Sequence, residues 1–440
     1  MQNESNLKLY STMMKKKVTS SMKLLDVIIL WYYFFSPSII LRPFVSVIWI
    51  VIGICGFFIF QCWHVEFGRY IQMIIGSITI LLITSLLSIN SEASLKYTMS
   101  IFLYVIIAYE ICSNYDNIIW FLKIAILFTI VHIVITIVHI VRIDVYREVF
   151  LPFLPREFHY RILAFAARNA YTGFTNQTST NSNFLSLAIG LFVYLVMMQK
   201  GVKKTALVIV VLGLVPLVAM TERRWPTIVV MVLLLFVASR SINSKWIKTM
   251  IVLAIAVIVV SGIFSSLNIF QGVLGKMEAE IKAGDITNGR NEIWRNTWEL
   301  VKQKPILGYG ADTFQVLIPT EANAHNSFIQ LILELGIVGS IVFFIPFIFM
   351  FMKSRVFVKN TDNICITDNE RAIVFFSIYW QAYSFLDSLF ESFFNSELSI
   401  FMLLISQFAI LNIFERIKQN TIIGKTDVKR EMNESKYIRV

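Results

Sequence analysis

Charged residues are scarce in this chain. Only 15% of its 440 residues are Asp, Glu, Lys or Arg, whereas 57% are hydrophobic. Soluble domains carry about 25% charged residues, so this shortage, together with repeated apolar runs of roughly 20 residues, excludes an ordinary soluble protein. The runs show no alternation with a period of two, which argues against a membrane β-barrel. The sequence therefore predicts an all-α polytopic membrane protein.

Motifs for metal binding and for common catalytic sites are also missing. The four cysteines, at positions 55, 62, 112 and 365, have no CxxC spacing, and the five histidines form no HExxH motif. The chain has no GxSxG elbow, no P-loop and no pair of carboxylates at a catalytic spacing. We therefore expect no metal ion and no cofactor. Nucleic acid is not an expected partner either, because no stretch resembles a soluble basic and aromatic domain.

The apolar runs predict about twelve membrane spans. Lys15, Lys16 and Lys17 precede the first run and no signal-peptide cleavage site follows it, so we expect an uncleaved span after a cytoplasmic segment 1–23. With twelve spans, most of the net charge of +11 falls in inner loops and in a basic cytoplasmic tail, 415–440, as the positive-inside rule requires. Residues 24–414 would then form one transmembrane domain in the cell membrane. The runs lie near residues 24–41, 44–62, 70–89, 95–112, 118–141, 184–199, 205–220, 226–239, 247–267, 327–352, 372–390 and 397–414.

Two of the predicted outer segments, 142–183 and 268–325, are long and contain arginine. Positive charge on the outer face opposes the topology signal, so it suggests a different use. Arginine binds phosphate and carboxylate through two parallel hydrogen bonds, although it can also reach lipid headgroups from the membrane surface. The outer arginines are Arg142, Arg147, Arg156, Arg161 and Arg168 in the first segment, Arg223 and Arg224 in the turn 221–226, and Arg290 and Arg295 in the second segment.

Three predicted spans start at the outer face beside these arginines or beside a histidine. Residues 181–183 (Asn-Ser-Asn) are expected to cap the sixth span, Pro226 stands in the first turn of the eighth, and His325 opens the tenth. Helix N-termini favour anions, because their N–H groups are unpaired and their dipole is positive. If these three spans are neighbours, the sequence predicts an anion pocket at the outer surface.

The segment before His325 has a structure of its own. Apolar residues between 293 and 301 share one helical arc, which predicts an amphipathic helix that either lies on the membrane or roofs a cavity. Trp294 and Trp298 on this arc are interpreted as anchors or as stacking platforms for sugar. Pro305 ends the helix, and a tight turn follows around Tyr309.

His325 is the strongest candidate for a general base. The positive end of a helix favours the neutral imidazole, which can accept a proton. His159, in the first arginine-containing segment, is a secondary candidate. Glu334 lies in the middle of an apolar run, where a carboxylate is costly and calls for a function. Nine helical residues place it about half a circle from His325, so we expect it to orient a neighbouring helix or to gate a cavity.

Three sequence segments together resemble a known family. They are GRNEIW (289–294), PILGYGADTF (305–314) and AHNSFIQLILELGIVG (324–339). In this order they resemble the signature of the O-antigen ligase and Wzy-type polymerase superfamily. Residues 168–183 are similar to the family's Arg-x-x-G-x-x-x-N-x-N segment. Residues 221–224 resemble its Ser-x-Ser-Arg turn without the serines, which leaves the choice between Arg223 and Arg224 open.

The resemblance implies a metal-independent glycosyltransferase of GT-C-type architecture, with a large outer loop before the tenth span. Its donor would be an oligosaccharide linked to undecaprenyl pyrophosphate. His325 would be the base, and Trp294, Tyr309 and Glu334 would support the site. Arg161 and Arg295 could replace Arg168 and Arg290 without conflict. The expected ligands of the pyrophosphate or glycan are Arg168, Arg223, Arg224, Arg290 and Asn326.

Composition favours one activity within this superfamily. The abundance of Ile, Lys, Phe and Asn is typical of a low-GC coding sequence, and hence of a Gram-positive source without lipid A. We therefore expect a polymerase of exopolysaccharide, capsule or O-antigen-type repeat units. A flippase and a chain-length regulator would be its partner proteins. The alternatives are a ligase that moves the glycan to another acceptor, and a flippase or transporter of an anionic glycolipid.

Overall fold

The computed structural model describes residues 27–30, 32, 68–241, 289–319, 323–360 and 366–437. Every regular element in these ranges is helical, which confirms the all-α fold class. The segment 1–23, the predicted spans 44–62 and 247–267, most of the span 24–41, and residues 268–288 of the second long loop lie outside the described residues. The count of twelve spans therefore stays a prediction.

Seven helices in the described ranges are long and apolar enough to cross a membrane. Each coincides, within a few residues at its start, with a predicted span, which confirms a multi-pass membrane protein. Two further helices, α10 (Arg224–Ser241) and α16 (Asp368–Asp387), occupy the predicted spans 226–239 and 372–390. The seven are α3 (Arg69–Leu86), α4 (Ser91–Ser113), α5 (Tyr115–Val141), α8 (Thr178–Met198), α9 (Gly201–Ala219), α15 (Ser327–Asn360) and α17 (Glu397–Tyr437).

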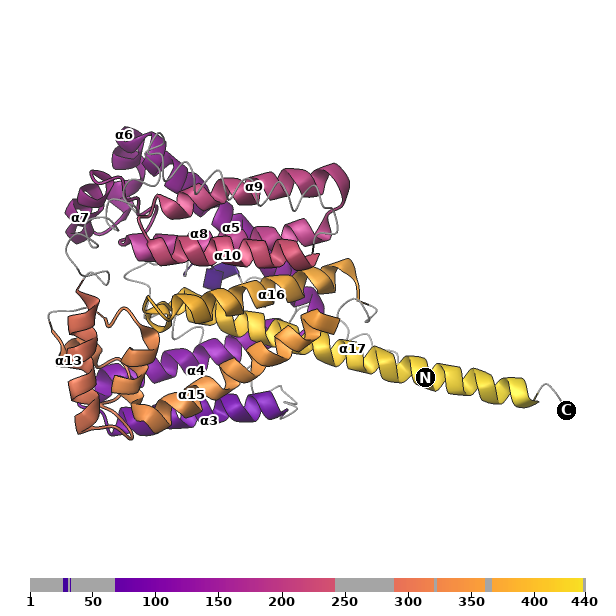
Figure 1. The fold of residues 1–440 in the computed structure, drawn as a ribbon. Coiled ribbons are helices and arrows are strands. Elements are labelled where there is room, and N and C mark those ends of the chain that lie inside the picture. The colour runs from indigo at the N-terminus through magenta and orange to yellow at the C-terminus, as the bar shows by residue number, and fades with distance from the viewer. Residues whose placement is uncertain are drawn as a thin grey trace, which may run out of the picture.

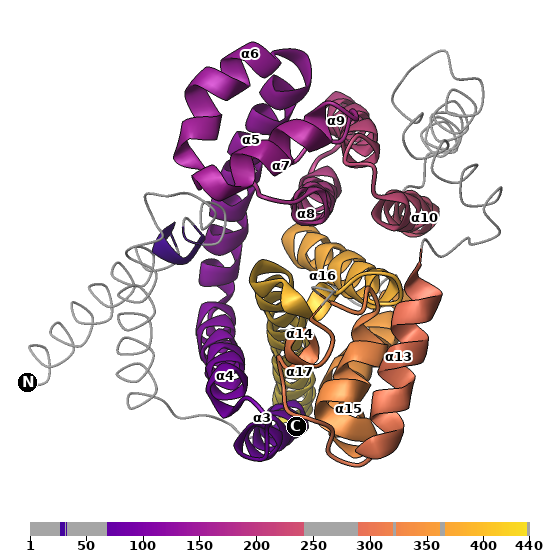
Figure 2. The same cartoon turned by 90° about the vertical axis from the view of Figure 1, so that its left-hand side faces the viewer.

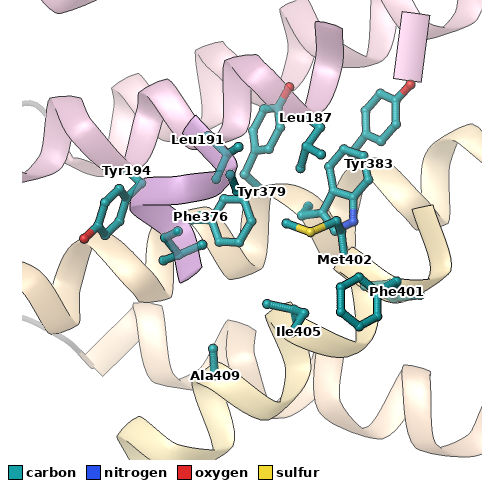
Figure 3. Close-up of a cluster of buried hydrophobic side chains, with 14 of the residues drawn as sticks. Leu187, Leu191, Tyr194, Phe376, Tyr379, Tyr383, Phe401, Met402, Ile405 and Ala409 are labelled. Carbon is teal, nitrogen blue, oxygen red and sulfur yellow. The ribbon is translucent and has the colours of Figure 1, made fainter. Parts of the chain in front are cut away.

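The centre of the bundle is α16, which packs against α8, α10, α15 and α17. Five of its six large aromatic side chains are fully buried, and Figure 3 shows Tyr379 and Tyr383 beside residues of α8 and α17. Most residues in the apolar stretches of α8 and α17 are buried too, whereas fewer than half of those in α3, α5 and α9 are buried. We infer that α8, α16 and α17 form the interior of the bundle and that α3, α5 and α9 present apolar side chains to lipid.

The two long arginine-containing segments lie at the same end of the bundle, called the site end here (Figures 1 and 2). The first forms α6 (Ile143–Val145), η2 (Tyr146–Phe150), η3 (Leu151–Phe153) and α7 (Arg156–Ala166). The described part of the second forms α13 (Arg290–Gln303) and α14 (Phe314–Leu317). Figure 2 looks onto this end and shows α7 and α13 on either side of the ends of α8 and α16.

Helix α13 is the amphipathic helix predicted before His325. Its apolar residues Ile293, Leu300 and Val301 pack against a cluster that contains Phe314 and Leu333. The helix therefore covers the protein with its apolar side, which favours the roof over the membrane-surface alternative. Trp298 is not part of this cluster and is 49% exposed.

The predicted helix cap at residues 181–183 is wrong. Helix α8 begins at Thr178, after Gln177, so Asn181 lies inside the helix rather than at its cap. Its side-chain oxygen hydrogen-bonds His132 (2.8 Å) and Thr136 (3.3 Å) of α5. Its amide donates to the carbonyl of Tyr171 (2.8 Å). Asn181 therefore braces α5 against α8.

The predicted tenth span is also not one continuous helix. Gly336 has φ +70° and ψ 178°, so it breaks α15 after its first nine residues, Ser327 to Leu335. The segment 305–310, which contains the PILGYG motif, pairs with the backbone groups that the break exposes. The four bonds are Tyr309 N–H to Leu333 O (3.1 Å), Gly310 N–H to Glu334 O (2.7 Å), Ile337 N–H to Pro305 O (2.8 Å) and Val338 N–H to Ile306 O (3.3 Å).

Replacing Gly336 by alanine is expected to destabilise the protein strongly. A Cβ atom there would clash with the carbonyl group of Ile306, and the positive φ adds strain of about 1–3 kcal/mol. The control is Gly213→Ala in α9, where a Cβ meets nothing within 4 Å and alanine favours the helix. Thermal unfolding in detergent should show a Tm several degrees lower for Gly336→Ala only. Equal Tm values for the two variants would contradict the packing described here.

Candidate functional site

Three cationic or basic side chains meet one carboxylate at the site end. The carboxylate belongs to Glu391, in the turn between α16 and η5 (Phe393–Asn395). Arg223 and Arg290 each place a guanidinium nitrogen 3.3 Å from its Oε1, and His325 Nδ1 lies 3.6 Å from its Oε2. The structure thus brings together the starts of α10 and α15, two of the three predicted spans that an anion pocket required to be neighbours, and Arg223 also contacts Thr178 at the start of the third, α8. The start of α13, which carries Arg290, joins them.

Each arginine is held by a second contact. Arg223, in the turn before α10, donates from Nε to the hydroxyl of Thr178 (3.1 Å) at the start of α8. Arg290 is the first residue of α13 and donates from Nη1 to the carbonyl of Phe390 (2.6 Å). One carboxylate balances only one of the two guanidinium charges. Because their side chains stay 25% and 16% exposed, the pair keeps positive charge and N–H donors for an anion.

His325 stands in the turn before α15, two residues ahead of its first residue, Ser327. Its φ of +51° is a left-handed conformation that non-glycine residues rarely adopt. The 3.6 Å from Nδ1 to Glu391 exceeds a hydrogen bond, so the interaction is electrostatic in this geometry. The facing carboxylate favours the proton on Nδ1, which leaves Nε2 as the acceptor. The ring is 28% exposed and therefore accessible to a substrate.

Asn326 caps the first segment of α15. Its side-chain oxygen accepts the N–H groups of Phe328 and Ile329, both at 3.0 Å, and its amide donates to the carbonyl of Leu389 (2.9 Å). The side chain therefore ties the His325 turn to the turn that carries Glu391. These protein contacts favour a positioning role over the substrate contact predicted from the sequence.

The charges around Glu391 determine its protonation. Burial alone would raise the pKa of this carboxyl, but His325, Arg223 and Arg290 together lower the pKa from 4.5 to about 2. Glu391 is consequently ionised at physiological pH. An ionised carboxylate can hold both arginines and the imidazole in place before a substrate arrives.

This shift predicts an acid dependence of stability. Because the folded-state pKa lies below the unfolded value, Glu391 contributes stability that is fully present above pH 4.5 and is lost as the pH falls towards 2. The contribution is about 3 kcal/mol at neutral pH. Glu391→Gln should therefore flatten the fall in Tm between pH 5 and the most acidic pH at which the purified protein stays soluble. A wild-type slope in that variant would show that another carboxyl controls acid stability.

The other arginines of the sequence analysis lie elsewhere. Arg223, rather than its neighbour Arg224, holds Glu391, and Arg290 does so rather than the exposed Arg295. Arg161 lies on α7 and Arg168 lies just after it, and both side chains are exposed. The structure therefore favours Arg223 from segment 221–224 and Arg290 from segment 289–294 as the arginines of the site.

The predicted supporting residues surround the His325 turn. Trp294 donates from its indole to the carbonyl of Ala324 (2.8 Å). Tyr309 is buried and donates to the carbonyl of Leu300 (3.2 Å). Glu334 accepts the N–H groups of Asp312 (3.0 Å) and Phe314 (3.3 Å). Glu334 thus holds a loop, whereas the sequence analysis expected it to orient a helix or gate a cavity. His159 contacts the carbonyl of Leu154 (2.7 Å) near the start of α7.

Sequence reasoning missed Glu391 altogether. The residue lies in the short polar turn between the predicted spans 372–390 and 397–414, on the predicted outer face. An acidic residue in this outer turn could have been selected as a candidate, but only cationic residues were expected in an anion pocket. Asp387, a second carboxylate one helical turn earlier, is fully buried at the end of α16. Within the described ranges, no group of three or more His, Cys, Asp or Glu residues could hold a metal ion.

Part of the chain matches a known protein family. Residues 209–344 match the family model of O-antigen ligase, and a search of the curated proteins finds no match. The matched region runs from α9 into α15, so it contains Arg223, Arg290 and His325, while Glu391 lies beyond it. The match confirms the resemblance seen in the sequence and indicates glycosyl transfer in general. Residues 209–344 of this multi-pass membrane protein are thus similar to the O-antigen ligase and Wzy-type polymerase superfamily.

Proposed function

We propose that this protein polymerises lipid-linked oligosaccharide repeat units on the outer face of the cytoplasmic membrane. The observation that carries the proposal is the meeting of Arg223, Arg290 and His325 around Glu391, with all three inside the O-antigen ligase match. The donor is a glycan on undecaprenyl pyrophosphate, as the family resemblance implies. The overall architecture is of the GT-C type.

The arginines bind the pyrophosphate leaving group. A pyrophosphate that separates from the anomeric carbon gains negative charge, and fixed positive charge stabilises it without proton transfer. Arg223 and Arg290 supply two guanidinium groups against one carboxylate, and both are partly exposed. Bidentate hydrogen bonds from arginine suit phosphate oxygens. The two arginines therefore supply charge that many glycosyltransferases obtain from a metal ion.

His325 accepts the proton of the acceptor hydroxyl. The acceptor oxygen forms a bond to the anomeric carbon of the donor while the bond from that carbon to the pyrophosphate oxygen breaks. The leaving pyrophosphate takes the electron pair, and the proton passes to the imidazole. Glu391 stabilises the imidazolium that forms, since its carboxylate lies 3.6 Å from Nδ1. A single displacement of this kind inverts the anomeric configuration.

The site end faces outward in this proposal, with both chain termini in the cytoplasm. The described basic residues Lys200 and Arg416 lie far from it, and both form ion pairs, with Asp368 (3.0 Å) and Glu370 (3.4 Å), at the start of α16. Cationic residues at that end agree with a cytoplasmic location. The outward-facing site favours transfer over transport, because a transporter of an anionic glycolipid would need its arginines near the middle of the membrane.

Deleting the gene and analysing the glycolipids tests the proposal. A polymerase predicts that single lipid-linked repeat units accumulate on the outer leaflet and that long polymer disappears, with both effects reversed by the wild-type gene. Long lipid-linked polymer that never reaches its final acceptor would show a ligase instead. Repeat units trapped on the inner leaflet would show a flippase.

A further inference from the structure

Gln330 lies between the two halves of the site. It is buried, on the first segment of α15, five residues after His325. Its side-chain oxygen accepts the N–H of Ala324 (3.3 Å) and contacts the hydroxyl of Ser392 (3.4 Å). Ala324 precedes His325, and Ser392 follows Glu391. One amide oxygen therefore reaches the residues next to both the proposed base and its carboxylate partner.

Glu334 fixes the orientation of that amide. The carboxylate is 3% exposed and accepts the N–H groups of Asp312 (3.0 Å) and Phe314 (3.3 Å). It also accepts the Nε2 amide of Gln330 (3.0 Å). With its nitrogen committed to Glu334, Gln330 must direct its oxygen towards Ala324. Backbone N–H donors at both ends thus impose one polarity on the whole chain of hydrogen bonds.

From this chain we infer that Gln330 and Glu334 are positioning residues for the His325–Glu391 pair. The inference rests on the proposed function. It adds two residues that affect the reaction through the positions of His325 and Glu391. The left-handed backbone at His325 is strained, so neighbouring contacts have to maintain it. Gln330 accepts a hydrogen bond from the N–H of Ala324, and the indole of Trp294 donates one to the carbonyl of Ala324 (2.8 Å). A displacement of about 1 Å at a catalytic group can lower a rate about a hundredfold.

Exchanging the two side chains tests the polarity. Gln330→Glu places two carboxylates against each other. Glu334→Gln turns an amide nitrogen towards backbone N–H groups that need an acceptor. In the double variant, Gln330→Glu with Glu334→Gln, the new carboxylate accepts from Ala324 and Ser392, and the new amide donates to it and accepts from Asp312. The double variant gives up the longer bond from Phe314.

The assay uses full-length purified protein in nanodiscs and lipid-linked repeat units extracted from a strain that lacks the gene. We expect each single variant to lower kcat by about 10- to 100-fold, with KM changed less than threefold. The double variant should recover to within about fivefold of wild type. Gln381→Glu controls for the cost of a new buried carboxylate, because Gln381 is buried on α16 beside Ser354. Its kcat per folded molecule should equal that of wild type.

Two results would overturn the inference. One is a wild-type kcat in both single variants, and the other is a double variant no more active than either single variant. Hydrogen exchange gives a readout that does not depend on activity, since amides around Ala324 and Asp312 should exchange faster in the single variants and recover in the double variant. A His325→Ala protein with wild-type activity would instead overturn the proposed function, so the two failures are distinguishable.

Discussion

Replacing His325 by alanine is expected to reduce glycosidic bond formation about a thousandfold. General acid–base groups contribute roughly 10²- to 10⁴-fold to a rate, and His325 is the imidazole that shares Glu391 with both arginines. The protein should still fold, because the ring is 28% exposed and the contacts that hold this turn through Ala324 and Asn326 do not use the imidazole. Cells that carry the variant should lack long polymer and accumulate single lipid-linked units at normal protein abundance.

His159 provides the matched control for this prediction. It also lies at the site end, on α7, but its ring contacts the carbonyl of Leu154 (2.7 Å) and not Glu391. His159→Ala should leave polymer length and the pool of lipid-linked units unchanged. Normal polymer in the His325→Ala strain would remove His325 from the mechanism. Loss of polymer in both strains would indicate a general defect at this end of the protein.

The second large effect is expected for Arg223. Arg223→Lys keeps the positive charge, but lysine cannot donate to Thr178 and Glu391 together with the planar geometry of a guanidinium. We expect an activity about a hundredfold lower, comparable to the loss of one donor to a developing oxyanion. The comparison is Arg224→Lys, at the adjacent position on α10. Its activity should stay within about threefold of wild type, because Arg223 is the one that holds Glu391.

The rates of both variants would be measured as release of undecaprenyl pyrophosphate, or as glycan formation, at saturating and at limiting donor concentrations. A deficit in Arg223→Lys that excess donor does not correct would place the interaction in the transition state. Similar losses in the two lysine variants would contradict the distinction drawn from the structure. A loss confined to Arg224→Lys would reverse the assignment.

The helical class and most span positions were predictable because they depend on local patterns. Apolar runs located α3, α4, α5, α8 and α9 within a few residues, and the apolar arc at 293–301 located α13. The break in α15 was not predictable in the same way. Gly336 stands within a continuous apolar run, and only the pairing with 305–310 shows that its backbone leaves the helix. Asn181 was misassigned because its partners His132 and Tyr171 are contributed by tertiary packing.

The cationic and basic residues of the site were predictable from the sequence, whereas its carboxylate was not. His325 and Arg223 were candidates because each precedes a predicted span on one face, and Arg290 because it is an arginine of the second long outer segment. The family resemblance named the same residues. Glu391 was not a candidate, because a carboxylate appears unfavourable in an anion site until two arginines are seen to share it. The choice between Arg223 and Arg224 depended on side-chain direction, which adjacent positions in a sequence do not reveal.

The central claim is that the site around His325 forms glycosidic bonds without a metal ion. The most direct test incubates purified protein in liposomes with lipid-linked repeat units from the deletion strain, in the presence of EDTA, and measures glycan length. The account predicts that wild-type protein builds longer lipid-linked glycans at an unchanged rate in EDTA and that His325→Ala protein does not. Elongation by the His325→Ala protein at the wild-type rate, or loss of wild-type elongation in EDTA, would contradict it.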